Sequence, residues 1–261
     1  MAKSANLAVV DSGPEPRHSF VMVGGRGKTG KSVLIRTLVE LAVERGGLPV
    51  IGDIDRTNSS LTAFPHLQPH LRRPAAADDV SIVDWLNEQV NEQIDGPGNT
   101  LILDAGGGDQ VGKYWVRDLD LAPFLESNGV RPVSIHMLGA DDDDLAYMRD
   151  LESVSNFQPA ATVIVLNEGV LPAGRSPSAA FSPIADNPIF RAVADRGAKV
   201  VRLPRLGCMT QIDRMRVGFR EAEAGAVLDG KARLGPIQRQ MVTLWLREVS
   251  TTLAMILPWI E

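Results

Sequence analysis

Hydrophobic residues along the chain fall into short continuous runs that alternate with segments of helical spacing. The runs at 19–23, 48–51, 100–103, 132–137, 162–166 and 199–203 predict strands. The segments at 32–43, 79–94, 142–154 and 187–196 repeat apolar residues every three or four positions and predict helices. Strands that alternate with helices predict an α/β fold, with a mostly parallel sheet and helices on both faces.

The two ends of the chain depart from this alternation. Residues 1–17 are mostly polar, with Gly13, Pro14 and Pro16, and predict a flexible leader before a single domain at 18–261. Near the other end, Gly235 and Pro236 begin an amphipathic helix predicted at about 236–257. Its polar face has few Lys and Arg residues, so packing on the sheet or a partner subunit is favoured over peripheral contact with a membrane.

A glycine-rich segment separates the first strand from the first helix. Its sequence is Gly25-Arg26-Gly27-Lys28-Thr29-Gly30-Lys31-Ser32, which fits G-x-x-x-x-G-K-[ST] at every defined position. In such a loop the backbone N–H groups surround phosphate oxygens, the lysine adds positive charge and the serine hydroxyl binds Mg²⁺. We therefore predict a P-loop NTPase fold that binds ATP together with Mg²⁺. The residues predicted to bind the nucleotide are Gly25, Gly27, Lys28, Thr29, Gly30, Lys31 and Ser32.

Carboxylates follow two of the predicted strands. Asp104 ends the buried run 100–103, and the glycines at 106–108 after it permit close approach to a γ-phosphate. Asp53 and Asp55 end the second strand. A phosphate loop needs acidic groups that hold Mg²⁺ and orient water, and we expect these three aspartates there. The alternative for each is that it caps the helix that follows.

Several of these motifs together resemble one family. The segment GGRGKTGKS, the pattern D-x-D-x-x-N from Asp53, the strand-end Asp104 and the run Val163–Asn167 look like the ParA/MinD group of partition and division-site ATPases. Within that group, the short D-x-D-x-x-N spacing is most similar to the plasmid conjugation and stability proteins known as TraL or StbB. The resemblance extends from Phe20 to about Pro204.

The resemblance implies a homodimer that encloses ATP between its subunits. The family has a signature lysine, five residues before the lysine of the loop, which reaches the partner's phosphates. Arg26 occupies that position here, so the resemblance implies a catalytic role for Arg26 in trans beside Lys31. Lys28 is the alternative source of that charge.

The resemblance also implies a role for each strand-end residue. Asp55 would position the catalytic water, Asp53 and Ser32 would assist Mg²⁺, and Asp104 would complete the metal site. Asn167 would hydrogen-bond adenine, and the backbone at Pro204 would line the base pocket. The alternative for Asn167 is simply a polar residue at the end of a strand.

Composition restricts the compartment and the partners. The lone Cys208 excludes an internal disulfide, and the N-terminus lacks a secretory run, so we expect a cytoplasmic protein. The apolar stretch Leu253–Ile260 is far shorter than the roughly 20 residues that span a bilayer. The net charge is −5, yet residues 196–239 contain ten Arg and Lys against four Asp and Glu, which suits either DNA contact or a solvated helix face.

Four further features have simpler interpretations. The acidic run at 141–144 is expected to cap a helix rather than bind a metal. Lys113 and Trp115 are assigned to a surface loop, with a switch segment after the glycines at 106–108 as the alternative, and the four histidines lack the spacing of a zinc site. The stretch at 56–78 is expected to be a long loop.

The leading hypothesis is an ATP-dependent switch with slow, Mg²⁺-dependent ATP hydrolysis. It would act in plasmid partition, stability or conjugative DNA transfer, together with DNA or a DNA-bound partner protein. The rival hypotheses are a small-molecule kinase or ligase on the same fold and a nucleotide-binding scaffold without turnover.

Overall fold

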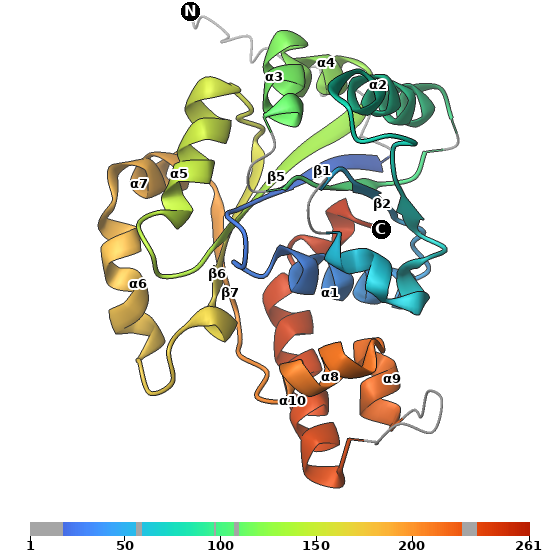
Figure 1. Ribbon diagram of the computed structural model, residues 1–261. Helices are drawn as coiled ribbons and strands as arrows, with labels where there is room; N and C mark the ends of the chain where they lie inside the picture. Colours follow the sequence, from blue (N-terminus) through green and yellow to red (C-terminus); the bar gives the residue numbers. More distant parts are fainter. Residues whose placement is uncertain (1–17, 56–58, 97, 107–109, 226–233) are drawn as a thin grey trace, which may run out of the picture.

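The computed structural model describes residues 18–55, 59–96, 98–106, 110–225 and 234–261. The predicted leader lies outside these residues. Seven strands form one parallel sheet with the order β3-β2-β4-β1-β5-β6-β7 (Figure 1). The strands are β1 His18–Gly24, β2 Val50–Asp53, β3 Leu71–Arg72, β4 Leu101–Asp104, β5 Val130–Leu138, β6 Ala161–Asn167 and β7 Lys199–Leu203.

Helices cover both faces of the sheet, as the sequence pattern predicts (Figure 1). The α-helices are α1 Lys31–Glu44, α2 Asp79–Asp95, α3 Val111–Asp118, α4 Leu121–Ser127, α5 Asp144–Arg149, α6 Pro177–Asp186, α7 Pro188–Asp195, α8 Met209–Met215, α9 Phe219–Ala224 and α10 Pro236–Leu253. Shorter turns are η1 Ser60–Ala63, η2 Pro65–Leu67, η3 Asp150–Val154, η4 Glu168–Val170 and η5 Leu257–Trp259. The predicted α/β class with a parallel sheet is confirmed.

The core divides according to the alternation of side chains along the central strand β1. Val21 and Val23 pack with α1, α10 and η5, whereas Phe20 and Met22 pack on the opposite face with α2, α3 and α4. Every residue of β1 is buried, because a central parallel strand is covered on both faces. The end of this strand is therefore a fixed support for the loop that follows it.

The structure corrects three local predictions. The stretch 56–78 includes η1, η2 and the edge strand β3 rather than being a loop throughout. Lys113 and Trp115 are buried on α3, because Lys113 pairs with Asp150 at 2.9 Å and the Trp115 indole donates to Asn87 at 2.9 Å. Helices α3, α4 and α6 were not predicted from the sequence.

The helix predicted at 142–154 is also irregular. Its α-helical part ends at Arg149, and η3 continues it with π-helical geometry. Glu152 on this turn is buried and forms ion pairs with His136 at 2.8 Å and Arg196 at 2.7 Å. These inward contacts accompany the departure from a regular helix.

Helix α1 is joined to α8 and α9 through a buried arginine. The Arg36 guanidinium pairs with Asp213 at 2.6 Å and lies between the rings of Phe64 and Phe219, 3.6 and 4.7 Å from their centroids. One turn further along α1, the Glu40 carboxylate accepts hydrogen bonds from the Phe219 N–H at 2.8 and 3.0 Å. The helix that follows the glycine loop is therefore tied to the C-terminal helices.

Among the described residues, no helix has both the length and the apolar character needed to cross a bilayer.

Candidate nucleotide-binding site

The predicted site residues gather at the carboxyl end of the parallel strands. The glycine loop follows β1, while Asp53 and Asp104 end β2 and β4 and stand opposite each other in register. Asn167 ends β6 and is in register with Leu203, the residue before Pro204. Ligands of open parallel sheets bind at the carboxyl ends of the strands.

The glycine loop is held in a curled conformation by its own polar groups. The Thr29 hydroxyl donates to the Arg26 carbonyl at 2.8 Å, and the Lys31 ammonium donates to the Gly25 carbonyl at 2.9 Å. Lys28 has a positive φ of 70°, which turns the chain sharply at the exposed part of the loop. Lys31 thus lies back across the loop, as a lysine that binds phosphates inside it would.

Asn167 supports the loop from β6. Its amide nitrogen donates to the Thr29 carbonyl at 2.7 Å, and its amide oxygen accepts from the Gly169 N–H at 2.8 Å. Gly30 packs so tightly against this amide that an added Cβ would lie 2.2 Å from the nitrogen. Gly30 also has φ of 100°, which disfavours other residues there. In this structure Asn167 contacts the glycine loop, and its expected hydrogen bond to adenine stays a prediction.

Pro204 lies at the neighbouring strand end. Its carbonyl accepts a hydrogen bond from the indole nitrogen of Trp245 at 2.8 Å, which fixes the chain after β7 to α10. The backbone at this position is therefore well supported. Its expected part in a base pocket stays a prediction.

Three carboxylates lie together beyond the loop. The Asp53 side chain is completely buried and accepts from the Asp55 N–H at 3.1 Å and from the Ser59 hydroxyl. A Cβ added to Gly106 would lie 3.1 Å from the Asp55 carboxyl carbon, so the chain after β4 runs against Asp55. Asp104 completes the group through its register with Asp53.

The Asp104 carboxyl is in an environment that disfavours its charge. Its pKa is raised to about 7, mainly by burial; the charges of Asp53 and Asp55 also raise it, and the Lys31 ammonium lowers it. Its Oδ1 atom is buried without a hydrogen-bond partner in the part of the chain that the structure describes. A divalent cation would satisfy such an oxygen, so the residues present fit Mg²⁺.

The remaining expected metal ligand is the Ser32 hydroxyl, which lies 2.5 Å from the Ser60 hydroxyl. Within the described ranges, no three His, Cys, Asp or Glu side chains form a metal cage by themselves. Mg²⁺ commonly uses one or two carboxylates together with substrate phosphates and water. This donor set is consistent with that mode of binding.

The Asp104 pKa predicts the pH dependence of the nucleotide-free protein. The folded pKa of about 7 exceeds the unfolded value of about 3.9, so ionisation opposes folding. This penalty is fully present above pH 7 and disappears toward pH 4, with a total of up to roughly 4 kcal/mol. Asp104→Asn should therefore stabilise the protein at pH 8 and flatten its stability between pH 8 and 5, as measured by urea unfolding.

The exposed Asp84 of α2 offers a matched control for this measurement. Asp84→Asn should retain the pH slope of the wild type. An Asp104→Asn variant with the wild-type slope would show that this carboxyl is not the source.

Arg26 is held within its own chain. Its guanidinium lies 3.1 Å from Asp141, 2.9 Å from Asp143 and 3.1 Å from Asp144. The acidic run thus binds an arginine of the glycine loop, and Asp143, at the N-cap of α5, makes no side-chain capping bond. Beside Arg26 and the acidic run lies a hollow of about 510 Å³. The basic residues in its lining are Arg26, Lys28 and Arg175.

The structure adds three polar residues that the sequence analysis did not select. Ser59 contacts Asp53, Ser60 contacts Ser32, and Arg73 lies 3.4 Å from the Asp53 carboxylate. They come from the stretch interpreted as a loop. Only the fold of that stretch, back against β2, brings them to the site.

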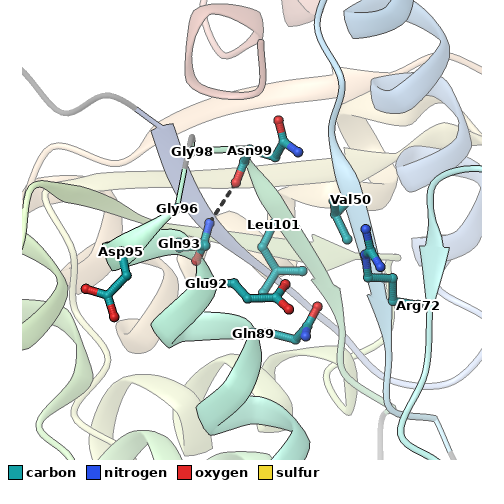
Figure 2. A pocket seen from close by; sticks show the side chains of 10 residues that line it. All are labelled: Val50, Arg72, Gln89, Glu92, Gln93, Asp95, Gly96, Gly98, Asn99 and Leu101. Carbon is teal, nitrogen blue, oxygen red and sulfur yellow. Dashed lines mark hydrogen bonds between the residues drawn. The ribbon is translucent and has the colours of Figure 1, made fainter.

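A second hollow lies at the amino-terminal ends of β2 and β4, away from the glycine loop. Figure 2 shows its lining, in which Glu92 and Arg72 extend toward each other over Val50 and Leu101, the first residues of β2 and β4. None of the predicted nucleotide or metal ligands lines this hollow. It is therefore separate from the candidate site.

The parallel sheet and the glycine loop after its central strand define a P-loop NTPase fold. Solved structures of MinD match this fold. MinD of Pyrococcus horikoshii OT3, solved with Mg-ADP, aligns with a TM-score of 0.52 at 15% identity over 92% of this chain and 98% of that one. MinD of Aquifex aeolicus aligns with a TM-score of 0.50 at 12% identity over 89% and 97%.

The MinC:MinD complex of Aquifex aeolicus gives a TM-score of 0.51 at 10% identity, covering 89% of this chain and 96% of that one. No protein-family model matches the sequence, and a comparison with curated proteins found no match. At these identities the likeness establishes a MinD-like fold. Substrate, partner and process have to be argued from the site.

Proposed function

We propose that the chain is an ATP-dependent molecular switch of the ParA/MinD type, with slow Mg²⁺-dependent ATP hydrolysis. The observation that carries this proposal is the glycine loop at the end of the buried strand β1, with Lys31 folded across it and Asp53 and Asp104 at the adjoining strand ends. Such a loop supplies backbone N–H groups and one ammonium group to a triphosphate. The neighbouring carboxylates supply the metal side of the same site.

Each group of predicted site residues has a separate role in the proposed hydrolysis of ATP. Gly25, Gly27, Lys28, Thr29, Gly30, Lys31 and Ser32 would surround the phosphates. Ser32, Asp53 and Asp104 would hold Mg²⁺, which neutralises phosphate charge when bound. Asp55 would orient a water whose oxygen bonds to the γ-phosphorus as the bond to the β-phosphate oxygen breaks. Asn167 and the backbone at Pro204 would contact the base.

We further propose that two copies enclose ATP, with Arg26 reaching the partner's phosphates. In this structure Arg26 is bound by Asp141, Asp143 and Asp144 of its own chain, so the trans contact requires those pairs to open. The pairs with Asp141 and Asp143 are exposed and contribute only about 0–1 kcal/mol each, whereas Asp144 is buried and its pair is the more costly one to open. Contacts with phosphates are strong enough to replace them.

Plasmid partition, stability or conjugative transfer is the process proposed, with DNA or a DNA-bound protein as the partner. The basic stretch 196–239 supports such contact in part. Arg196 and Arg220 pair with Glu152 and Glu44, but Arg214 and Arg216 are exposed and have no ion pair with any described residue. Local positive charge of this kind attracts phosphate backbones.

ATP-dependent dimerisation tests this proposal. Light scattering on the purified protein should show a doubling of mass with Mg²⁺ and ATP, or with a non-hydrolysable analogue. Arg26→Ala should remain monomeric while calorimetry shows ATP binding close to that of the wild type, because the proposed contact is made to the other subunit. Arg26→Lys, which carries the family's signature residue, should dimerise.

The other outcomes separate the rival functions. A strictly monomeric ATP complex would oppose the switch and favour a kinase or ligase on this fold. Dimerisation of Arg26→Ala to the wild-type extent would remove the trans role of Arg26. ATP binding with dimerisation but without phosphate release would indicate a scaffold rather than an ATPase.

A further inference from the structure

Arg73 stands beside the metal-side carboxylates because of strand register. In the edge pair, Ile51 is opposite Leu71 and Gly52 is opposite Arg72, so the next residue along, Arg73, comes level with Asp53. Asp53 is itself opposite Asp104 on the other side. Arg73, Asp53 and Asp104 therefore lie side by side at the carboxyl ends of the neighbouring strands β3, β2 and β4.

Side-chain contacts agree with this register. The Arg73 Nε lies 3.4 Å from the Asp53 Oδ2, and its terminal nitrogen donates to the Asp55 carbonyl at 3.3 Å. Asp53, Asp55 and Arg73 line a hollow of about 190 Å³ together with Pro74 and Ile82. One guanidinium thus contacts both the carboxylate proposed for the metal and the main chain of the residue proposed to orient water.

The charges explain why an arginine is useful there. Asp53 is fully buried, and a buried carboxylate is costly unless a cation or hydrogen bonds compensate it. Arg73 brings positive charge to Oδ2 of Asp53, the carboxylate proposed to hold the divalent cation. Its side chain is 44% exposed, so it can leave that oxygen without opening the core.

We propose that Arg73 is a positioning residue that takes the place of Mg²⁺ at Asp53 in the nucleotide-free protein and competes with the metal for that carboxylate. This inference rests on the proposed function, because it concerns the same metal site. Its consequence is that the metal binds strongly only when nucleotide phosphates add their own ligands. Arg73 thereby makes metal loading depend on the nucleotide and keeps the chain at Asp55 in place between turnovers.

Titration of the nucleotide-free protein with Mn²⁺, followed by electron paramagnetic resonance, tests this role. Arg73→Gln should bind Mn²⁺ about tenfold more tightly than the wild type, because a unit positive charge next to the ligand has been removed. Arg73→Lys should restore weak binding. A merely structural role predicts the opposite sign, since damage to the site lowers metal affinity.

The adjacent Arg72 is the matched control, because it lines the hollow at the amino-terminal ends of β2 and β4 (Figure 2). Arg72→Gln should bind Mn²⁺ like the wild type. Equal Mn²⁺ affinity in Arg73→Gln and the wild type would overturn the proposal, as would an equal gain in Arg72→Gln.

The measurement also distinguishes this inference from the proposed function. A wild-type protein that binds no ATP would refute the switch. The Mn²⁺ titration would still decide whether Arg73 competes with the metal for the Asp53 carboxylate. A wild-type protein that hydrolyses ATP, with unchanged Mn²⁺ affinity in Arg73→Gln, would refute the role of Arg73 alone. If Arg73→Gln does not fold, the comparison of Arg73→Lys and Arg73→Met decides in the same way.

Discussion

Replacing Lys31 with alanine is expected to weaken the binding of Mg-ATP by about 100-fold or more. The Lys31 ammonium already donates to the Gly25 carbonyl at 2.9 Å, and its side chain is buried in the nucleotide-free protein. It is therefore positioned to contact phosphates with little loss of side-chain freedom. Removal of a buried, charge-assisted contact of this kind is costly. Isothermal titration calorimetry with ATP and Mg²⁺ measures the loss.

Lys28 of the same loop provides the control. It is exposed and has no ion-pair partner within the described ranges, so Lys28→Ala should change nucleotide affinity much less than Lys31→Ala. Equal losses in the two variants would mean that the loop binds phosphates only through its general positive charge. Unchanged affinity in Lys31→Ala, with the fold intact by circular dichroism, would contradict the assignment of this loop as the phosphate site.

Arg36→Ala is expected to lower the free energy of unfolding by about 3–5 kcal/mol. The Arg36 side chain is 1% exposed, pairs with Asp213 and lies between the Phe64 and Phe219 rings. Truncation would leave a cavity between three helical segments and remove both cation–π contacts, each of which contributes about 1–2 kcal/mol when desolvated. Urea unfolding at neutral pH measures the change.

Two further variants separate packing from charge. Arg36→Met should lose less stability than Arg36→Ala, because methionine fills much of the same volume between the rings. Arg45→Ala, at the exposed end of the same helix, removes only the surface pair with Glu261 and should cost about 1 kcal/mol or less. The importance of the junction would be disproved by equal losses in Arg36→Ala and Arg45→Ala.

The Arg36 junction also has a consequence for the proposed switch. Ser32 and Arg36 are on α1, and Ser60, which contacts Ser32, lies in the same short segment as Phe64. Phe64, Arg36 and Phe219 then connect this segment to α9. Side chains in contact with one another therefore connect the metal side of the proposed site to the C-terminal helices, so a movement at one can displace the other.

The sequence alone determined the fold class and located the glycine loop after the first strand. Continuous apolar runs predict buried strands because a central parallel strand is covered on both faces, and six of the seven strands were found in this way. The glycine loop was recognised because its chemistry is local, requiring small residues, a lysine and a hydroxyl at fixed spacing. The aspartates at 53 and 104 could be placed because parallel strands end at the same edge.

Tertiary structure alone decided which distant side chains meet. The two-residue strand β3 is too short to leave a periodic pattern, so the approach of Arg73 to Asp53 was not predictable from spacing. The pairing of Arg26 with the acidic run 115–118 residues away, and the burial of Arg36 between two phenylalanines, depend on how helices pack on the sheet. Local spacing specifies strands and loops, whereas contacts between charged side chains far apart in sequence are set by the packing of those elements.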